Sequence, residues 1–202
     1  MAPRKKGRSR RSNPKKTEAH YKVQDPYFKQ AKAHGYRARS AYKLKDILRK
    51  YPIVRRGDKV LDLGAAPGSF LQVLNEIGAE AVGMDLKEIE PIEGVSTIVA
   101  DIFDYKPKGK FDVVTSDLMP NTTGIKFLDN EESVDLELRA LQVAKKCLRD
   151  DGNAVFKIFN SNELKRFTNN ARDCFREVHV FKPDAVRSTS KEIYVVCIGF
   201  KC

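Results

Sequence analysis

The stretch Val60-Leu-Asp-Leu-Gly-Ala-Ala-Pro-Gly-Ser69 decides the fold of this 202-residue chain. Its first four residues are mostly aliphatic, which predicts a buried strand. The turn that follows holds Gly64, Pro67 and Gly68, and apolar residues then recur at helical spacing over residues 70–77. Strand, turn and helix together bring backbone N–H groups to one edge of a sheet. A ligand can approach that edge closely because glycine has no side chain.

The spacing within this turn narrows the class of ligand. Gly64-x-x-x-Gly68 differs from G-x-G-x-x-G, which disfavours a nicotinamide or flavin site, and no Gly-Lys-Ser/Thr of a triphosphate-binding P-loop follows. The D-x-G-x-x-P-G pattern is similar to motif I of S-adenosylmethionine-dependent methyltransferases. Asp85 closes the next predicted strand 23 residues after Asp62, near the ~20-residue offset at which an acid meets a ribose diol. An ordinary glycine turn of an α/β protein is the alternative, and Asp85 counts against it.

Positive charge is concentrated at the front of the chain. Residues 1–50 carry 17 Lys and Arg against 3 Asp and Glu, a net charge of +14, whereas residues 51–202 carry 21 against 24, a net of −3. Such an asymmetry indicates a polyanionic partner, most often nucleic acid. Residues 1–22 contain nine Lys and Arg and almost nothing apolar, so we expect a disordered basic arm that contacts RNA. A solubilising tail is the alternative.

Cysteine and histidine residues predict neither a disulfide framework nor a metal site. The four cysteines form no C-x-x-C pair, and the three histidines are scattered. This pattern fits reduced intracellular thiols better than disulfides. No apolar run reaches membrane length, and no signal-peptide core is present. We therefore expect a cytoplasmic monomer with one domain at residues 23–202, no metal and no membrane association.

Strand and helix patterns alternate after the glycine turn. Strands are predicted at 59–63, 80–85, 95–100, 111–116, 152–158, 175–181 and 192–199, and helices at 38–50, 68–78, 131–149 and 161–172, with a short helix before Gly35. This alternation is typical of an α/β fold with a mostly parallel, seven-stranded, doubly wound sheet. The ten residues 182–191 are too few for a helical crossover, so the last two strands should form an antiparallel hairpin. Residues 101–110 have room only for a loop.

Ionisable residues lie near the carboxyl ends of predicted strands, where doubly wound sheets bind ligands. Asp117 follows one strand, Lys157 lies between apolar neighbours in the next, and Glu192 opens the last. A lysine inside a buried strand is costly unless it is paired or functional, and Asp117 offers a partner. The alternative is a lysine that snorkels to solvent at the strand end.

The helix predicted at 38–50 has one apolar face and one face that is almost purely basic. The basic side chains in and next to it are Arg37, Arg39, Lys43, Lys45 and Arg49. Such a row is suited to bind phosphate groups, which predicts RNA contact along this helix. A solvated amphipathic helix that packs on the sheet is the alternative.

Five motifs together resemble a known family. They are Arg37-x-Arg39-Ser-Ala-Tyr-Lys43-Leu, Asp62-Leu-Gly-Ala-Ala-Pro-Gly68, Ser116-Asp-Leu-Met-Pro-Asn121, Phe156-Lys157-Ile-Phe159, and Lys182-Pro183 with Ser190-x-Glu192-x-Tyr194. In this order they resemble the FtsJ family of RNA ribose 2′-O-methyltransferases, over residues 25–202. The resemblance implies a Rossmann-like methyltransferase fold, S-adenosylmethionine as cofactor and RNA as substrate. Compact members that methylate large-subunit ribosomal RNA are the most similar, which implies a uridine of that RNA as the target.

The resemblance also implies site residues. The family's catalytic Lys-Asp-Lys-Glu tetrad falls on Lys43, Asp117, Lys157 and Glu192. Its cofactor-binding positions fall on Gly64, Gly68, Phe70, Asp85, Asp101 and Asp117. Ser69-Phe70 and Leu118-Met119-Pro120 replace the Gly-Trp and Met-Ala-Pro of many bacterial members.

The chemistry of ribose methylation agrees with such a tetrad. A ribose 2′-hydroxyl is a poor nucleophile and must lose its proton as the methyl group transfers. A lysine accepts that proton only where its neutral form is favoured, as it is by burial and by a nearby cation. The hypothesis is that Lys157 acts as general base or orienting group, that Asp117 positions it, and that the other two residues hold the hydroxyl and the charge balance. Three alternatives stay open: a transfer-RNA methyltransferase, an inactive RNA-binding ribosome-assembly protein of the same fold, and a nicotinamide oxidoreductase.

Overall fold

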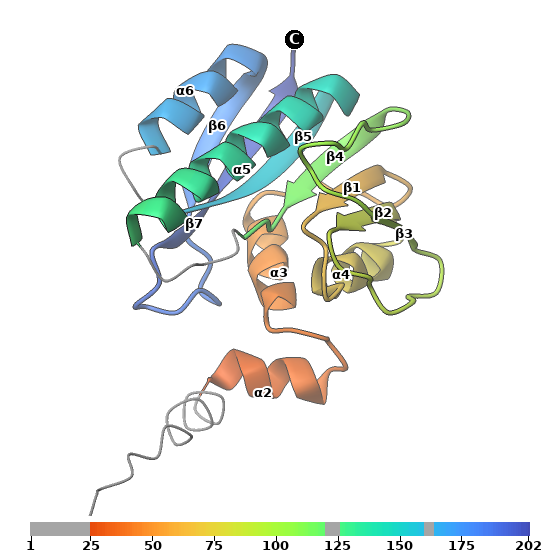
Figure 1. Cartoon of the computed structure of the whole chain (residues 1–202). Coiled ribbons are helices and arrows are strands. Elements are labelled where there is room, and N and C mark those ends of the chain that lie inside the picture. Colours follow the sequence, from red (N-terminus) through yellow and green to blue (C-terminus); the bar gives the residue numbers. More distant parts are fainter. Residues whose placement is uncertain (1–24, 120–125, 160–163) are drawn as a thin grey trace, which may run out of the picture.

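The computed structural model describes residues 25–119, 126–159 and 164–202, which form one sheet covered by helices (Figure 1). The strands are β1 (Lys59–Leu63), β2 (Glu80–Asp85), β3 (Ser96–Val99), β4 (Phe111–Ser116), β5 (Leu148–Phe159), β6 (Phe175–Phe181) and β7 (Glu192–Phe200). The helices are α2 (Pro26–Ala33), α3 (Ser40–Lys50), α4 (Ser69–Ile77), α5 (Lys126–Cys147) and α6 (Leu164–Cys174). The predicted basic arm, the end of the third motif at Pro120 and Asn121, and the start of the helix predicted at 161–172 lie outside the described residues.

The seven strands have the order β3-β2-β1-β4-β5-β7-β6. Strands β1 to β5 run parallel, as the alternation of strands and helices predicts. Strand β7 enters between β5 and β6 and pairs antiparallel with both, which confirms the predicted hairpin. Because β7 runs against β5, its first residue, Glu192, lies opposite Phe159 at the carboxyl end of that strand. The reversal therefore carries the start of β7 to the edge where parallel sheets bind ligands.

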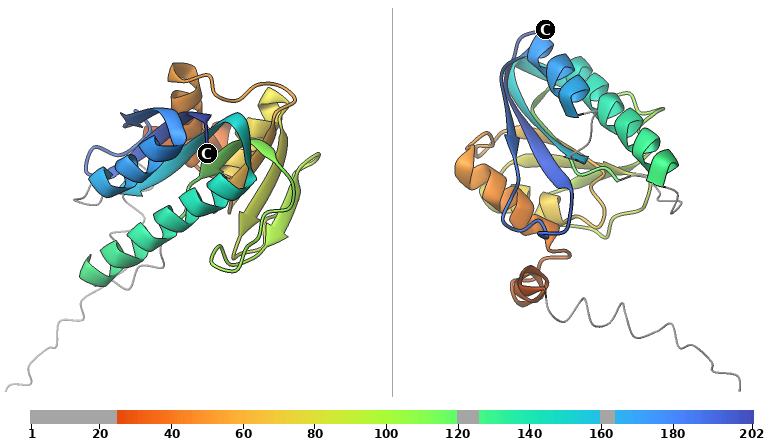
Figure 2. Two further views of the ribbon diagram at one scale, coloured as in Figure 1. Left: turned by 90° about the horizontal axis from the view of Figure 1, so that it is seen from above. Right: turned by 90° about the vertical axis from the view of Figure 1, so that its left-hand side faces the viewer.

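Helices cover both faces of the sheet, with α5 and α6 on one face and α3 and α4 on the other (Figure 2). Successive strand residues point to opposite faces. Leu61 and Leu63 accordingly pack in the cluster under α5 and α6, whereas Val60 packs in the cluster under α3 and α4. The same alternation places Asp62 and Lys157 on the α3–α4 face. None of the described helices is long and apolar enough to cross a membrane.

The junction between α5 and β5 differs from the prediction. The helix was expected to run to residue 149, but it ends at Cys147, and Leu148 opens β5 instead. Strand pairing shifts register between Phe111 and Val113, and Asp151 adopts a left-handed conformation with φ of 64° beside this irregularity. Leu148 is nevertheless buried in the cluster under α5, so an apolar pattern read along the chain could not separate the two conformations. Residues 101–110 contain no helix, as predicted.

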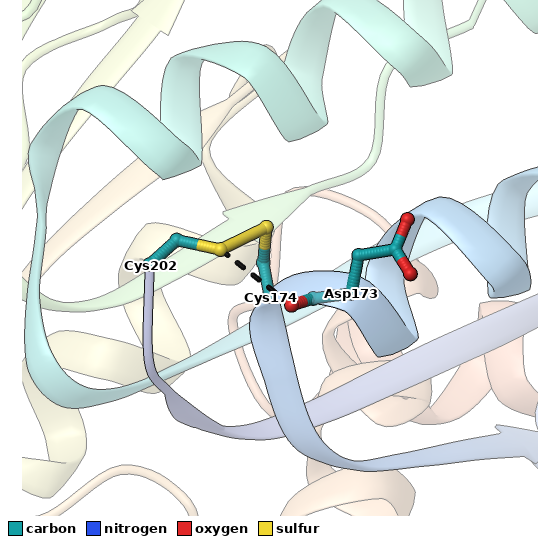
Figure 3. The surroundings of a disulfide bond; sticks show 3 residues. All are labelled: Asp173, Cys174 and Cys202. Atoms are coloured by element: carbon teal, nitrogen blue, oxygen red, sulfur yellow. Dashed lines mark hydrogen bonds between the residues drawn. A yellow bond between two sulfur atoms is a disulfide. The ribbon is translucent and has the colours of Figure 1, made fainter.

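Two of the four cysteines are joined, contrary to the expectation of fully reduced thiols. Cys174, at the end of α6, forms a disulfide with Cys202, and their Cα atoms are 5.1 Å apart (Figure 3). Cys147 and Cys197 are free and buried. The amide of Lys201 donates to the carbonyl of Cys174 at 2.9 Å, so the end of β7 and the end of α6 lie side by side. This proximity comes from the hairpin, and no cysteine spacing along the chain indicates it.

Gly64→Ala should destabilise the protein more than Gly109→Ala. Both glycines have a positive φ, 74° and 90°, and a left-handed conformation costs an L-residue roughly 1–2 kcal/mol. A Cβ on Gly64 would also lie 2.8 Å from Leu118 Cα, whereas a Cβ on Gly109 meets nothing within 4 Å. Urea denaturation of both variants measures the difference. Equal losses would show that the chain at Leu118 moves aside without cost.

Candidate active site

The four predicted catalytic side chains meet at the carboxyl ends of the parallel strands. Lys43 comes from α3, Asp117 directly follows β4, Lys157 lies in β5, and Glu192 opens β7. Lys43 Nζ is 2.5 Å from Glu192 Oε1, and Lys157 Nζ is 3.2 Å from Asp117 Oδ1. The fold therefore assembles two ion pairs, one of which joins residues 149 positions apart in the chain.

Tyr194 joins the two ion pairs, although sequence reasoning assigned it no role. Its hydroxyl is 2.9 Å from Asp117 Oδ1 and 2.9 Å from Glu192 Oε1. A phenol has one proton and can donate it to only one of these carboxylates at a time. Burial, with the negative charges of Asp117 and Glu192, raises the pKa of Tyr194 well above its ordinary value, so the hydroxyl stays protonated. The Glu192-x-Tyr194 spacing carried the signal, because alternate strand residues share a face.

Burial makes the pairing of these charges obligatory. Lys43, Lys157 and Glu192 are only 7%, 3% and 5% exposed. A charge taken out of water is tolerated only where it is paired and hydrogen-bonded. The Lys157 ammonium also donates to the Asp117 carbonyl oxygen at 2.7 Å, so Asp117 holds it through both backbone and side chain. The alternative that Lys157 snorkels to solvent is therefore wrong.

Each of the five cations in the basic row along α3 already has a partner. Arg37 donates to the carbonyls of Pro67, Glu90 and Pro91, Arg39 pairs with Asp25, Lys43 with Glu192, Lys45 with Glu76, and Arg49 with Asp46 and Asp184. Arg37 ties the glycine turn to residues 90 and 91, which is a structural role. The side chains of Lys45 and Arg49 are nevertheless 39% and 71% exposed, so RNA contact along this helix stays a prediction.

A cavity of about 570 Å³ opens beside the tetrad, at the ends of β1, β2 and β4. Four of the six predicted cofactor positions line it: Gly64, Asp85, Asp101 and Asp117. The other two, Gly68 and Phe70, are not among its lining residues. Phe70 is buried in the apolar cluster under α4, so its side chain serves the core.

The lining of this cavity fits S-adenosylmethionine. Asp85 Oδ2 accepts from the Ala66 amide and its Oδ1 accepts from the Lys87 amide, both at 2.9 Å, so the carboxylate is fixed and keeps lone pairs for a ribose diol. Leu86 and Phe103 are 59% and 52% exposed and offer apolar surface to a base. The charged lining residues are Asp85, Asp101, Asp117, Asp135 and Lys87. Four carboxylates against one ammonium suit a ligand that carries a sulfonium and an ammonium group.

Asp62, the first residue of the D-x-G-x-x-P-G motif, is fully buried. Its Oδ1 accepts from the Thr115 hydroxyl at 2.6 Å, whereas its Oδ2 has no hydrogen-bond partner within the described part of the chain. Burial raises the pKa of Asp62 to about 8, against the opposing Thr115 bond and with added repulsion from Asp117 and Asp85. An orphaned buried acceptor costs ~1–3 kcal/mol. The motif thus retains a buried acid that lowers the stability of the folded protein, which is typical of a binding site.

A parallel sheet with an antiparallel β7 insertion, together with an acidic cavity at its carboxyl edge, defines an S-adenosylmethionine-dependent methyltransferase. Residues 36–200 match the model of the FtsJ-like methyltransferase family. The chain belongs to this family. The predicted family, fold class and cofactor are therefore confirmed, whereas the cytoplasmic location and monomeric state remain predictions.

Relatives and a solved structure agree with this family. The chain is 45% identical over 181 residues to "Ribosomal RNA large subunit methyltransferase E" of Methanothrix thermoacetophila, covering 85% of this chain and 71% of that protein. It is 40% identical over 189 residues to the protein of the same name from Myxococcus xanthus, covering 87% and 89%. A solved structure described as a ribosomal RNA methyltransferase from Plasmodium falciparum has a TM-score of 0.73 at 26% identity, covering 82% of this chain and 98% of that one.

Asp62→Asn should stabilise the ligand-free protein increasingly as pH rises. Asp62 has a pKa of about 8 in the folded protein, whereas an unfolded Asp titrates near about 3.9. The folded state therefore binds the extra proton, and its stability falls from about pH 4 to pH 8, by up to ~1.4 kcal/mol per pH unit. Asn cannot titrate and removes this loss.

Melting curves across this pH range test the prediction for Asp62. The gain in melting temperature of Asp62→Asn should grow up to about pH 8 and then level off. Asp104→Asn replaces an exposed carboxylate and serves as the control. A gain that does not change with pH would show that folded Asp62 does not titrate in this range.

Proposed function

We propose that this protein methylates the ribose 2′-hydroxyl of RNA, with a uridine of large-subunit ribosomal RNA as its target. The observation that carries the proposal is the buried network of two lysine–carboxylate pairs joined by Tyr194, one of whose members, Asp117, also lines the cofactor cavity. Relatives at 40% and 45% identity that are named ribosomal RNA large subunit methyltransferase E support the substrate class. The complete tetrad counts against an inactive RNA-binding protein.

Asp117 marks the place of the reaction, because it belongs both to the cavity and to the tetrad. When bound, S-adenosylmethionine would supply a methyl group activated by its sulfonium charge. The protein must then hold the 2′-hydroxyl in line with that methyl group and receive or redirect its proton. We assign both tasks to Lys157, whose Nζ is fixed by two contacts with Asp117.

Lys43 and Glu192 balance the charge of the network. Their ion pair is almost fully buried, and removing one partner of such a pair typically costs ~3–5 kcal/mol. Tyr194 couples this pair to Asp117. When the phenol donates to Asp117, that carboxylate becomes a weaker acceptor for Lys157. When the phenol donates to Glu192 instead, Asp117 is a stronger acceptor for Lys157. The position of one phenolic proton therefore adjusts how firmly Lys157 is paired.

The cofactor contacts follow from the lining of the cavity. Asp85 would accept hydrogen bonds from the adenosine ribose, since both its oxygens keep free lone pairs beyond their backbone contacts. Asp101 accepts from the Phe103 amide at 2.9 Å, which holds its carboxylate beside the apolar surface offered to the base. Gly64 lines the cavity, and a side chain there would collide with Leu118, so glycine keeps this part of the lining in place.

Lys157→Ala should abolish ribose methylation while the fold and cofactor affinity persist. General-base contributions are commonly ~100- to 10,000-fold, so single-turnover rates should fall by that factor. Asp117 keeps the Tyr194 hydrogen bond and is 20% exposed at its side chain, so its charge is not stranded. Lys157→Arg should not restore the rate, because a guanidinium stays protonated.

The assay follows methyl transfer to ribosomal RNA and maps 2′-O-methyl positions. Lys165→Ala removes an exposed lysine of α6 and is the matched control. A near-normal rate in Lys157→Ala would overturn the tetrad assignment. An active Lys157→Arg would leave the residue an orienting role only. Methylation of bases instead of ribose would contradict the proposed reaction.

Asp85→Ala should weaken S-adenosylmethionine binding by roughly 10- to 150-fold, because hydrogen bonds to a charged group are worth ~1.5–3 kcal/mol. Calorimetric titration measures the affinity, with Asp104→Ala as an exposed control. Asp85 also holds the amides of Ala66 and Lys87, so melting curves of the ligand-free variants must accompany the titration. Unchanged affinity would remove Asp85 from the cofactor site.

A further inference from the structure

A second cavity, of about 360 Å³, lies between the start of α2 and the loop that precedes β7. We call it the Arg187 groove, and its polar lining includes Asp25, Tyr27, Arg39, Arg187, Ser188 and Thr189. The proposed cofactor contacts and the tetrad use none of these residues. The groove therefore needs an explanation of its own.

Asp25 holds two guanidinium groups side by side at the base of the groove. Its Oδ2 is 2.7 Å from Arg39 Nη1 and 3.3 Å from Arg187 Nε. Its Oδ1 accepts from the amides of Tyr27 and Phe28 and so caps α2. Burial alone would raise the pKa of Asp25, but Arg39, the cap and Arg187 together hold it below its ordinary value. The ionised carboxylate thus orients both arginines.

Arg187 is the cation of this pair that faces outward. Its side chain is 46% exposed, against 18% for Arg39. Among the described residues it uses only Nε, which leaves the N–H groups of both terminal nitrogens for a ligand. The planar fork of a guanidinium matches two phosphate oxygens. Ser188, Thr189 and Tyr27 also line the groove beside this guanidinium.

The charge of the groove decides between possible anions. Asp184 also lines it, is 78% exposed at its side chain, and lies 3.7 Å from Arg49. This carboxylate would repel an anion that has no hydrogen-bond donors, such as inorganic phosphate. A nucleotide instead presents phosphate oxygens to Arg187, O–H and N–H donors to Asp184, and a base face to Tyr27. The mixed lining therefore favours a nucleotide.

The groove adjoins the tetrad through two shared segments. Arg39 precedes Lys43 by four residues at the start of α3, about one helical turn or ~5.4 Å of rise. Thr189 precedes Glu192 by three residues, at most about 11 Å of extended chain. An RNA strand whose 2′-hydroxyl lies at the tetrad can therefore reach the groove with a neighbouring nucleotide.

We propose that the Arg187 groove binds one nucleotide of single-stranded RNA next to the methylated ribose, with its phosphodiester on Arg187 and its base against Tyr27. The inference rests on the proposed function and adds the path of the RNA strand. Asp25 is a positioning residue, since it acts through the two arginines. The groove selects an unpaired strand, because only an unstacked base can lie on Tyr27.

Arg187→Ala should weaken binding of a single-stranded ribosomal RNA oligonucleotide and lower its salt dependence. Loss of one phosphate contact should reduce the slope of log affinity against log salt by about 0.7. Fluorescence anisotropy across a salt series measures both. Arg187→Lys should keep the slope. Arg172→Ala removes an exposed arginine near the end of α6 that does not line the groove, and it should change nothing. Cofactor affinity and melting temperature should not change in any of these variants.

Tyr27→Leu should weaken binding of the same RNA without a change in slope, because stacking is uncharged; Phe28→Leu, exposed on the same helix, is its control. If Arg187→Ala leaves the salt slope unchanged, Arg187 does not bind a phosphate and the proposed nucleotide site is wrong. A lower melting temperature of that variant would then show that Arg187 serves only to stabilise the fold. Unchanged affinity in Tyr27→Leu would show that the base does not lie on Tyr27.

The methylation assay of the unmodified protein tests the proposed function independently of the groove. If it shows no ribose methylation while the slope falls, the groove stands as an RNA-binding site and the proposed function fails.

Discussion

The hydrogen-bond ladder between β5 and β7 is the constraint on which the site depends. It runs antiparallel, so β7 begins where β5 ends, and Lys157 is registered with Tyr194 and Phe159 with Glu192. Two charged residues and a phenol thereby reach one sheet edge from two strands. A parallel β7 would carry its first residue to the opposite edge. Insertion of the last strand between β5 and β6 thus has a chemical consequence as well as a topological one.

The buried charges are arranged so that each lysine has an acid. Lys43 with Glu192, and Lys157 with Asp117, form two neutral pairs, and Tyr194 joins them without adding charge. Neutral pairing keeps the cost of desolvation tolerable. Arg39, Lys45 and Arg49 also pair with acids, whereas Arg187 keeps both terminal nitrogens without a partner among the described residues.

The carboxylates that line the cofactor cavity have few cations beside them to balance their charge. Asp62 is buried, one of its oxygens has no hydrogen-bond partner among the described residues, and Asp85 and Asp117 add to the repulsion that it feels. Such an arrangement works against folding, and a cationic ligand would relieve it. Local rules of stability are broken most often at functional sites, where the ligand supplies the missing partner. The unfavourable burial of Asp62 and the negative charge of the cavity lining are therefore two aspects of one site.

The sequence by itself predicted the glycine turn, the terminal hairpin and most of the elements, because periodicity and turn chemistry are local properties. The four tetrad positions came from the resemblance to the FtsJ family. Only the tertiary structure decided that β7 lies between β5 and β6, that Tyr194 bridges the pairs and that Arg37 serves the turn. It also decided that Phe70 packs in the core instead of lining the cavity, and that Cys174 pairs with Cys202. These facts depend on contacts between segments far apart in the chain. No local pattern contains them, since the partner of a residue is set by the topology that brings two segments together.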